Sequence, residues 1–380
     1  MRGHLTSRRR LVTGAGLVMA ALAAPALAQK SKSAATSAVV AQIVDISNEQ
    51  QDVARDFLVG SRAAWQDINA KGGVRGRPVQ HLSIETDGSP ASLRAAVKQV
   101  KDNPACVVLS GTASDPVAAQ LVALLQEDNT PIAHAAPWLQ NSSVEVDDRT
   151  FPIFATRQEQ IGHALKSLAV VGMQELGIVY ATPREYGLYQ TDVERIAVSL
   201  KLRVQSFRPA AGGLAPLGQG LGSSAPAVML FVGGTPELVQ FTQGLAKHSR
   251  QRYVIALADV NLQTMLQMGG SRATPVIATQ AVPLVNQTSL PVVRAYRDTL
   301  ARLFDEPPAA LSLAGFIAAR YTYEVLSDVD AALTRPAVLA AFQKRAPMDI
   351  GGFRIAFNAQ RRGSSYVTQS MLATDGRLIG

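Results

Sequence analysis

The stretch Asp67-Ile68-Asn69-Ala70-Lys71-Gly72-Gly73-Val74-Arg75-Gly76-Arg77-Pro78-Val79 joins a helical pattern to a strand pattern. Before it, residues 50–70 repeat apolar side chains at helical spacing, from Val53 to Ile68, which predicts an amphipathic helix. The two adjacent glycines end this helix, because glycine readily adopts the left-handed backbone found at helix ends. Short apolar runs at 39–46 and 79–84 flank the helix. The sequence therefore predicts a strand-helix-strand unit at the start of the fold.

The same alternation continues along most of the chain. Further strands are expected at 105–109, 131–135, 176–180, 204–207, 227–232, 253–256 and 276–281. Helices are expected at 89–103, 115–126, 158–171, 189–200, 236–247, 291–304, 312–326 and 336–345, and strand-like runs at 353–357 and 365–372. The stretch 209–226 is rich in Gly, Ala, Ser and Pro and predicts a loop with one helical turn near 214–221. Strands separated by single helices are typical of parallel sheets covered by helices on both faces. The predicted class is α/β, with two successive units.

The N-terminal 28 residues have the features of a cleaved export signal. Four arginines, at positions 2 and 8–10, precede a mostly apolar run, and Ala26-Leu27-Ala28 is a typical cleavage site. The apolar run is shorter than the roughly 20 residues that span a membrane. Ser7-Arg8-Arg9-Arg10-Leu11-Val12 predicts the twin-arginine route, and an ordinary signal peptide with a basic start is the alternative. The protein is therefore expected outside the cytoplasm.

Composition excludes several classes of protein. The chain has 380 residues, of which 47% are apolar and 17% charged, so it can build a sizeable core. Its net charge is +8, but removal of the four leader arginines leaves 33 basic against 29 acidic side chains, and these are scattered. This pattern argues against nucleic-acid binding. The single cysteine, Cys106, lies in an apolar run, which excludes an internal disulfide and argues against a nucleophile.

Signatures of catalysis or metal binding are missing from the sequence. There is no G-x-S-x-G elbow and no phosphate-binding G-x-x-x-x-G-K loop. Beyond the leader, His81, His134, His163 and His248 do not pair at metal-ligand spacing. We therefore expect a binding protein without cofactor, metal or catalytic residues. A hydrolase using Asp259 or His134 with a water molecule is the remaining enzymatic alternative.

The order of elements and several strings resemble the type I periplasmic binding proteins, in particular the leucine/isoleucine/valine-binding family. The strings are residues 67–79 quoted above, 107–114 (VVLSGTAS), 131–137 (PIAHAAP), 184–187 (REYG) and 231–235 (FVGGT). The resemblance covers nearly all of residues 38–380. It implies two Rossmann-like lobes joined by three crossings, with the ligand in the cleft between them. Lobe one is expected at 38–155 plus 281–347, and lobe two at 156–280 plus 348–380.

Candidate ligand contacts in lobe one follow two expected strands, since ligands of open α/β sheets bind beyond the carboxyl ends of the strands. Thr112, Ala113 and Ser114 precede a helix and offer hydroxyl and N–H groups to a carboxylate. The alternative for Ser114 is a plain helix cap. The backbone of Ala135 and Ala136 adds donors from the neighbouring strand.

Further candidates lie in other loops of the expected cleft, one in lobe one and the rest in lobe two or at the first crossing. Trp138 offers a flat surface for stacking, or packs in the lobe. By resemblance, Tyr186 matches a tyrosine that covers the ligand; the alternative is a packed surface side chain. Thr235 falls where the family often has another ligand contact, although a helix cap is the stronger interpretation. Arg157, at the first crossing, pairs with an anionic ligand group, or forms a surface or hinge salt bridge.

Two departures from the family bear on the ligand. Pro137 stands where the amino-acid binders have a Ser or Thr that holds the carboxylate. The acid that holds the ammonium corresponds either to Ala258 or to Asp259. These departures disfavour a typical α-amino acid, and an aromatic or other small carboxylate, or an amide, remains open.

The resemblance implies a monomeric, periplasmic substrate-binding protein that delivers an amino acid-like or other small organic solute to the membrane permease of an ABC transporter. An exported sensor of the same fold, which signals to a membrane receptor, is the alternative.

Overall fold

The computed structural model describes residues 37–380 except 211, 249 and 373–377. The predicted signal peptide, residues 1–28, lies outside the described residues. The first unit consists of β1 (Val39–Asp45), α1 (Gln51–Ala70) and β2 (Gln80–Thr86). Gly73 has a φ of 71°, and a Cβ there would lie 2.0 Å from the Arg77 oxygen, so only glycine fits this turn. The predicted helix, turn and strand are all present.

Asn69 fastens the end of α1 to the start of the second strand. Its side-chain nitrogen donates to the Val79 oxygen at 2.8 Å, and its side-chain oxygen accepts from the Val79 N–H at 2.9 Å. This reciprocal pair sets the path of the chain through the turn. The amide therefore gives the quoted stretch a defined geometry that glycines alone would not provide.

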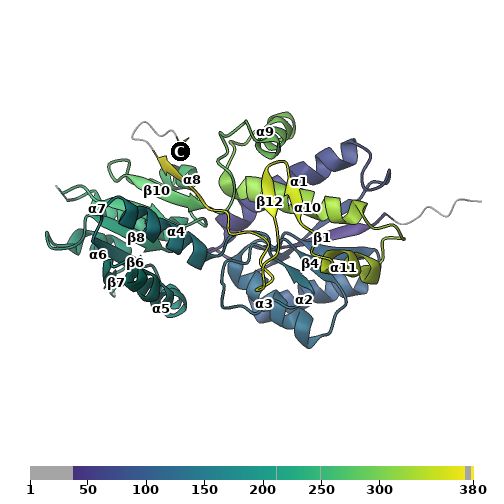
Figure 1. The fold of residues 1–380 in the computed structure, drawn as a ribbon, viewed down its shortest axis with the longest axis horizontal. Coiled ribbons are helices and arrows are strands. Elements are labelled where there is room, and N and C mark those ends of the chain that lie inside the picture. Colours follow the sequence, from purple (N-terminus) through teal and green to yellow (C-terminus); the bar gives the residue numbers. More distant parts are fainter. Residues whose placement is uncertain (1–36, 211, 249, 373–377) are drawn as a thin grey trace, which may run out of the picture. The chain divides into compact units, whose positions relative to one another are not determined.

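A five-stranded parallel sheet has the order β2-β1-β3-β4-β5. Its other strands and the helices that follow them are β3 (Cys106–Ser110), β4 (Ala133–Ala135), β5 (Thr150–Phe151), α2 (Pro90–Asp102) and α3 (Asp115–Glu127). One face packs against α2 and α3. The other packs against α1 and three late helices, α9 (Pro291–Leu303), α10 (Ala310–Ser327) and α11 (Arg335–Gln343). Helices on both faces agree with the predicted class (Figure 1).

The second sheet has seven strands in the order β14-β13-β10-β9-β8-β6-β7. Its five parallel strands are β6 (Glu175–Tyr180), β7 (Arg203–Phe207), β8 (Val228–Val232), β9 (Tyr253–Ala256) and β10 (Val276–Gln280). The helices α4 (Arg157–Val170) and α5 (Pro183–Ser199) cover one face. The other face carries α6 (Leu214–Gly220), α7 (Thr235–Leu245) and α8 (Leu262–Gln267). The helical turn predicted near 214–221 is therefore present as α6.

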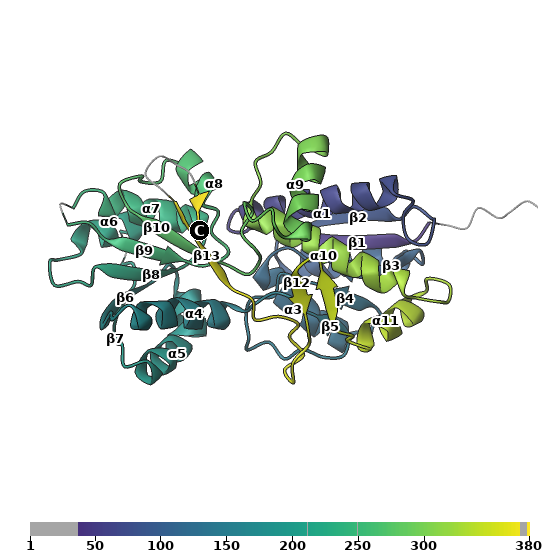
Figure 2. The same ribbon diagram turned by 45° about the horizontal axis from the view of Figure 1, so that its top comes forward.

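The helices α1 and α10 pack at very short range, side by side in both views (Figures 1 and 2). A Cβ on Gly60 would lie 1.6 Å from the Ser312 oxygen, and one on Gly315 would lie 1.9 Å from the Phe57 oxygen. The Ser61 hydroxyl donates across the contact to the Gly315 oxygen at 3.3 Å. Glycine is thus required on both sides of this helix pair.

The C-terminal region differs from the expectation. Two short strands, β11 (Met348–Ile350) and β12 (Phe353–Ile355), form an antiparallel hairpin whose side chains join the core beneath the five-stranded sheet. These residues were expected in lobe two. In contrast to this hairpin, the strand β13 (Thr368–Leu372) lies in the second sheet, where it pairs antiparallel with β10. The strand β14 (Leu378–Ile379) pairs with β13. The runs at 353–357 and 365–372 therefore lie in different sheets; the lobe boundaries themselves stay predictions.

No helix among the described residues is both long enough and apolar enough to cross a membrane.

Candidate functional site

The segment Thr112-Ala113-Ser114 lies where β3 ends and α3 begins, and all three residues are fully buried. The Thr112 hydroxyl is 2.9 Å from Nε2 of His134. Ser114 is the helix cap: its hydroxyl accepts from the Val117 N–H at 3.4 Å and donates to Asp45 at 2.8 Å. Ser114 therefore caps α3, which was the alternative considered from the sequence. Both hydroxyls already have partners inside their own lobe, and their contact with ligand stays a prediction.

The backbone of Ala135 and Ala136 is also engaged. The Ala135 oxygen accepts from Gly111 at 2.9 Å, and the Ala136 N–H donates to the Phe151 oxygen at 2.9 Å. Ala136 has a φ of 46°, a left-handed conformation that turns the chain out of β4. This turn directs the chain toward Trp138, whose N–H donates to the Thr112 oxygen at 2.9 Å.

Trp138 is 1% exposed and belongs to the core of the first lobe. Its ring centroid lies 5.9 Å from that of Phe57 and 5.2 Å from that of Phe154. Its indole Nε1–H donates to Oδ1 of Asp259 at 2.8 Å. Asp259 follows β9 in the other sheet, so this hydrogen bond joins the two lobes. Trp138 thus packs as a core residue and also anchors an acid from the loop that follows β9.

Arg157, the first residue of α4, forms an ion pair with Asp259. Each side chain is 11% exposed. An Nη atom of Arg157 also donates to the Tyr189 hydroxyl at 3.1 Å. Burial lowers the pKa of the Arg157 guanidinium, but the attraction of Asp259 and the neighbouring acids outweighs it, so the pKa is raised overall. The positive charge of Arg157 is therefore compensated within the protein.

Tyr186 and Thr235, the other predicted contacts of the second lobe, have different surroundings. The Tyr186 ring lies 4.2 Å from the Arg208 guanidinium and packs edge-on against Tyr180 with centroids 5.2 Å apart. The Thr235 hydroxyl accepts from the Asn261 N–H at 3.1 Å. Gly234, not Thr235, occupies the cap position of α7. The helix-cap interpretation of Thr235 is therefore wrong, because the helix starts one residue earlier than a cap at Thr235 requires.

A pocket lies among these residues, and we refer to it as the charged pocket. Its lining comes from Glu49, Gln50, Asp52 and Val53 at the start of α1, and from Arg157, Glu185, Gly233, Gly234, Thr235, Pro236 and Asp259. Its cavity volume is about 30 Å³, room for about two water molecules. Of the predicted site residues, the pocket brings together Arg157, Thr235 and Asp259. The other seven do not line it.

The first turns of α1, α4, α5 and α7 all contribute to the charged pocket. Helix N-termini carry partial positive charge, and acids in the first turn are stabilised there. Asp52 and Glu185 occupy first turns in this way. Burial raises the pKa of Glu185 above its usual range. Glu49, Asp52 and Glu185 were not predicted. Only Asp52 follows a predicted helix start, because α5 begins at Pro183 and was expected at 189.

A second polar contact joins the lobes beside this pocket. The side-chain nitrogen of Asn261, the cap of α8, donates to Asp56 on α1. Burial raises the pKa of Asp56 to about 6, and the hydrogen bond from Asn261 opposes part of this rise. Asp56 was not predicted, because an acid in the middle of an amphipathic helix is ordinarily exposed.

The acid of the second-lobe loop is Asp259. The neighbouring residue, Ala258, contributes only its N–H, which donates to the Gln160 side-chain oxygen at 2.8 Å. The same oxygen accepts from the Thr279 hydroxyl at 3.1 Å. Gln160 therefore holds the loop from behind and leaves Asp259 to face Arg157 and Trp138.

Residues 37–374 match the model of a family described as periplasmic binding protein. The chain belongs to this family, of the type I fold that also includes leucine/isoleucine/valine-binding proteins. It is a family of binding proteins located in the periplasm. No curated protein matches the sequence significantly.

Solved structures with the same fold are numerous. An extracellular ligand-binding receptor from Verminephrobacter eiseniae has 19% identity and a TM-score of 0.82, over 90% of this chain and 100% of the other. A substrate-binding periplasmic protein from Ralstonia solanacearum has 20% identity and a TM-score of 0.78, over 90% and 99%. An ABC transporter substrate-binding protein from Desulfitobacterium hafniense, solved with Leu, has 16% identity and a TM-score of 0.72, over 90% and 99%. At these identities the likeness establishes the fold alone.

Proposed function

We propose that the protein is the exported substrate-binding component of an ABC importer and captures a small organic solute between its lobes by hinge closure. The observation that carries this proposal is the charged pocket, because residues from both lobes line it. Arg157, Thr235 and Asp259 approach it from one side, and Glu49 and Asp52 from the other. A solute held there touches both lobes at once, which is the geometry that couples binding to closure.

Hinge closure requires differential affinity. A solute shifts the lobes toward the closed arrangement only if it binds that arrangement more tightly than the open one. The Trp138–Asp259 and Asn261–Asp56 hydrogen bonds already join the lobes, so the protein has its own contacts that favour closure. A micromolar affinity corresponds to about −8 kcal/mol, which a few charge-assisted hydrogen bonds and apolar contacts supply.

The proposed solute is amino acid-like, an aromatic or other small carboxylate, or an amide. Besides the three predicted residues that line the pocket, the proposed ligand set keeps Trp138 and Tyr186, together with the segments 112–114 and 135–136. The proposed partner is a membrane permease, the protein acts as a monomer, and it carries out no catalysis. Tyr186→Ala tests the least central member of the set: weaker binding with unchanged stability supports its contact with ligand, and unchanged affinity removes it.

A screen of melting temperature on residues 29–380 tests the proposal, since a ligand that binds only the folded state raises the melting temperature. The panel holds amino acids, aromatic acids, short-chain acids and amides. We expect one class to raise the melting temperature while the solute is recovered unchanged. Turnover of the solute, or no response from any class, would contradict the proposal.

Two threonines of α7 provide a matched pair for locating the site. Both are buried, but only Thr235 lines the charged pocket, whereas the Thr242 hydroxyl bonds to the Val239 oxygen of its own helix. Thr235→Val is expected to weaken the responding solute, and Thr242→Val is expected to leave affinity unchanged. Equal effects of the two substitutions would place the binding site elsewhere.

Export and transport are tested in cells. Replacement of Arg8 and Arg9 by lysine is expected to block export if the twin-arginine route is used. Deletion of the gene is expected to abolish uptake of the responding solute. Retained uptake together with a lost transcriptional response would favour the sensor alternative.

A further inference from the structure

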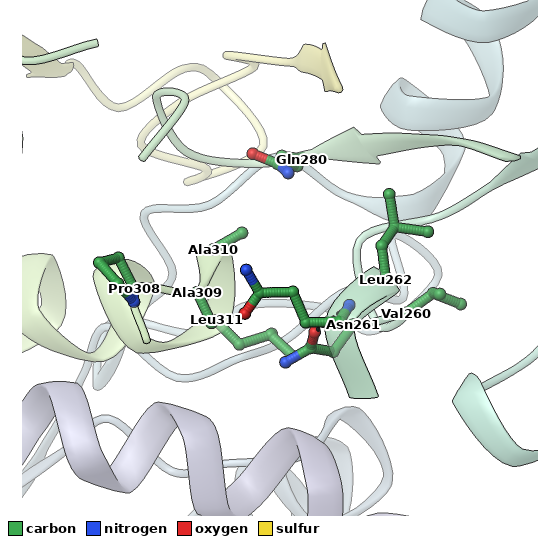
Figure 3. A pocket seen from close by; sticks show the side chains of 9 residues that line it. Val260, Asn261, Leu262, Gln280, Pro308, Ala309, Ala310 and Leu311 are labelled. Atoms are coloured by element: carbon green, nitrogen blue, oxygen red, sulfur yellow. Dashed lines mark hydrogen bonds between the residues drawn. The ribbon is translucent and has the colours of Figure 1, made fainter. Parts of the chain in front are cut away.

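The two ends of the second sheet differ in what they can bind. Its strands lead into the charged pocket and into a smaller pocket, which is bordered by residues 260–263, Gln280 and residues 308–311 (Figure 3). The smaller pocket has a cavity volume of about 20 Å³, room for about one water molecule, and so admits no solute. The opposite end of the sheet is an exposed surface, which suits a larger partner.

Five connections between helices and strands form this opposite end. Each of the helices α4 to α8 leads into one of the five parallel strands, so the helix ends and the strand starts lie together. The connections are residues 171–174, 200–202, 221–227, 246–252 and 268–275. We refer to these connections, with the last turn of each helix and the first residue of each strand, as the basal surface.

The basal surface is strongly basic. Its described residues include six lysines or arginines, and the only acid among them is Glu175, which forms an ion pair with Arg203. The six cations are Lys201, Arg203, Lys247, Arg250, Arg252 and Arg272. All of them except Arg252 are exposed. The fold therefore gathers, at one end of the second lobe, cations that are far apart in the sequence.

Helix ends explain only part of this positive charge. Helix C-termini carry partial negative charge, and a cation near them stabilises the fold. Arg252 has this role, because its Nη2 donates to the oxygens of Leu221 and Gly222, just after α6, at 3.2 and 2.8 Å. Three of the exposed cations, by contrast, have no side-chain partner among the described residues: Lys201, Lys247 and Arg272. Their charge is available to a partner of the protein.

Exposed apolar side chains accompany these cations. Eight large apolar side chains are exposed among the described residues, and five of the eight belong to the basal surface. The five are Val170, Val171, Val198, Tyr253 and Met268, with exposed fractions from 43% to 79%. Compensation of helix ends does not explain them, because it requires charge and no apolar surface. Exposed apolar groups that gather in one region are typical of an interaction surface.

We propose that the basal surface binds an anionic lipid bilayer. The cations attract the negative headgroups, and the apolar side chains enter the boundary between headgroups and acyl chains. A second copy of the chain is a poor partner, because two surfaces with surplus positive charge repel each other. The charged pocket lies beyond the other ends of the strands, so a bilayer on the basal surface leaves it uncovered. This inference goes beyond the proposed function and does not depend on it.

Co-sedimentation of residues 29–380 with lipid vesicles tests the proposal. One set of vesicles contains phosphatidylglycerol and phosphatidylcholine in equal parts, and the other contains phosphatidylcholine alone. We expect binding to the first set that is lost at high salt, because salt screens exposed charges, and binding to the second set that is weaker by about tenfold or more. No binding to the first set at low salt, or equal binding to both sets, overturns the proposal. Binding to soluble heparin as tight as that to the anionic vesicles overturns the assignment to lipid.

Charge reversal assigns the contact to the basal surface. Lys247→Glu combined with Arg272→Glu is expected to weaken binding to the anionic vesicles by more than about tenfold. The matched control is Lys344→Glu combined with Arg354→Glu, which makes the same change in net charge at exposed positions beside the first sheet. We expect this control to keep most of the binding. Equal losses in the two double variants would show that net charge alone causes the attraction, and they would overturn the assignment to this surface.

Val170→Ser combined with Val171→Ser tests the apolar part of the contact. Both side chains are exposed, so the melting temperature is expected to stay unchanged while binding to the anionic vesicles weakens. Unchanged vesicle binding would overturn the role of the apolar side chains. Both basal variants are expected to keep the response to solute in the melting-temperature screen, because the charged pocket lies at the other end of the strands. Loss of that response in a folded basal variant would contradict the separation of the two surfaces.

Discussion

Replacement of Asp259 by asparagine isolates the role of the Arg157–Asp259 pair. Asparagine keeps the shape of the side chain and an oxygen that accepts from Trp138, but it removes the negative charge. Arg157 then stays buried without its main counter-charge, and breaking a buried pair from one side costs about 3–5 kcal/mol. Asp115 and Glu185 also attract Arg157, so we expect the lower end, about 3 kcal/mol. That is a large part of the roughly 5–15 kcal/mol that stabilises a typical domain.

The assay is urea unfolding followed by circular dichroism, arranged as a double-mutant cycle with Arg157→Met. Groups in direct contact show coupling energies of about 0.5–3 kcal/mol, and we expect a value in the upper half of that range for this pair. Asp102→Asn is the control. Asp102 pairs with Lys98 on the surface, where it is 63% exposed, and such pairs contribute little to stability.

A cost below about 1 kcal/mol for Asp259→Asn, or additive single substitutions, would refute this reasoning. Either result would mean that Asp259 does not neutralise Arg157 in solution. The guanidinium would then be available to an anionic ligand, as one interpretation of the sequence proposed.

Three further predictions follow from packing, burial and the contact between the lobes. Gly315→Ala places a Cβ 1.9 Å from a backbone oxygen of α1, and it is expected to lower the free energy of unfolding, measured in urea, by more than about 3 kcal/mol. The control Gly187→Ala has no atom within 4 Å of its Cβ and is expected to leave the free energy of unfolding unchanged or to raise it. Burial lowers the pKa of His134 from 6.5 to about 3, so the unfolded state takes up the proton first. Stability is therefore lost as pH falls from 6.5 toward 3, by up to about 1.4 kcal/mol per pH unit. His134→Asn is expected to flatten this slope, and an unchanged slope would show that other groups cause it. The change in tryptophan fluorescence on addition of the solute is expected to vanish in Trp138→Phe and to persist in Trp65→Phe. The reverse result would mean that the tryptophan whose surroundings change on binding is the one on α1.

Much of the fold was predictable from local signals. Residues 67–79 combine a helix face, two glycines and a strand start, and each of these depends on neighbours in the sequence. The strand β12 was expected within 353–357, but its partner β11 was missed because it has only three residues, too few for an alternating pattern to be recognised. The place of this hairpin in the core beneath the five-stranded sheet depends on packing against α9 and α10, including a hydrogen bond from Val292 N–H to the Gly351 oxygen at 3.0 Å. Nothing in the local sequence reports that contact.

The site was predicted less completely, for a physical reason. Sequence identifies residue types that suit a ligand, but it does not show whether another residue has already engaged them. Arg157, Asp259 and Trp138 were each predicted as separate ligand contacts, and in the structure Arg157 and Trp138 both bind Asp259. Conversely, Gln280 ends an ordinary apolar strand, and only the structure shows that its amide is buried with one atom unpaired.

These internal contacts determine what a solute must provide. In the arrangement with the lobes in contact, Asp259 already satisfies Arg157 and Trp138, so a solute that merely replaces these bonds gains little free energy. A net gain in binding free energy comes from protein groups that lack hydrogen-bond partners. A solute that supplies a partner to such a buried polar atom gains more than one that replaces an existing hydrogen bond by an equivalent one. Affinity is therefore expected to depend less on the ion pair that dominates the charged pocket than on hydrogen bonds from the solute to groups that the protein has not already paired. On this argument, conservative replacement of Arg157 together with Asp259 would change stability more than it changes the ranking of solutes.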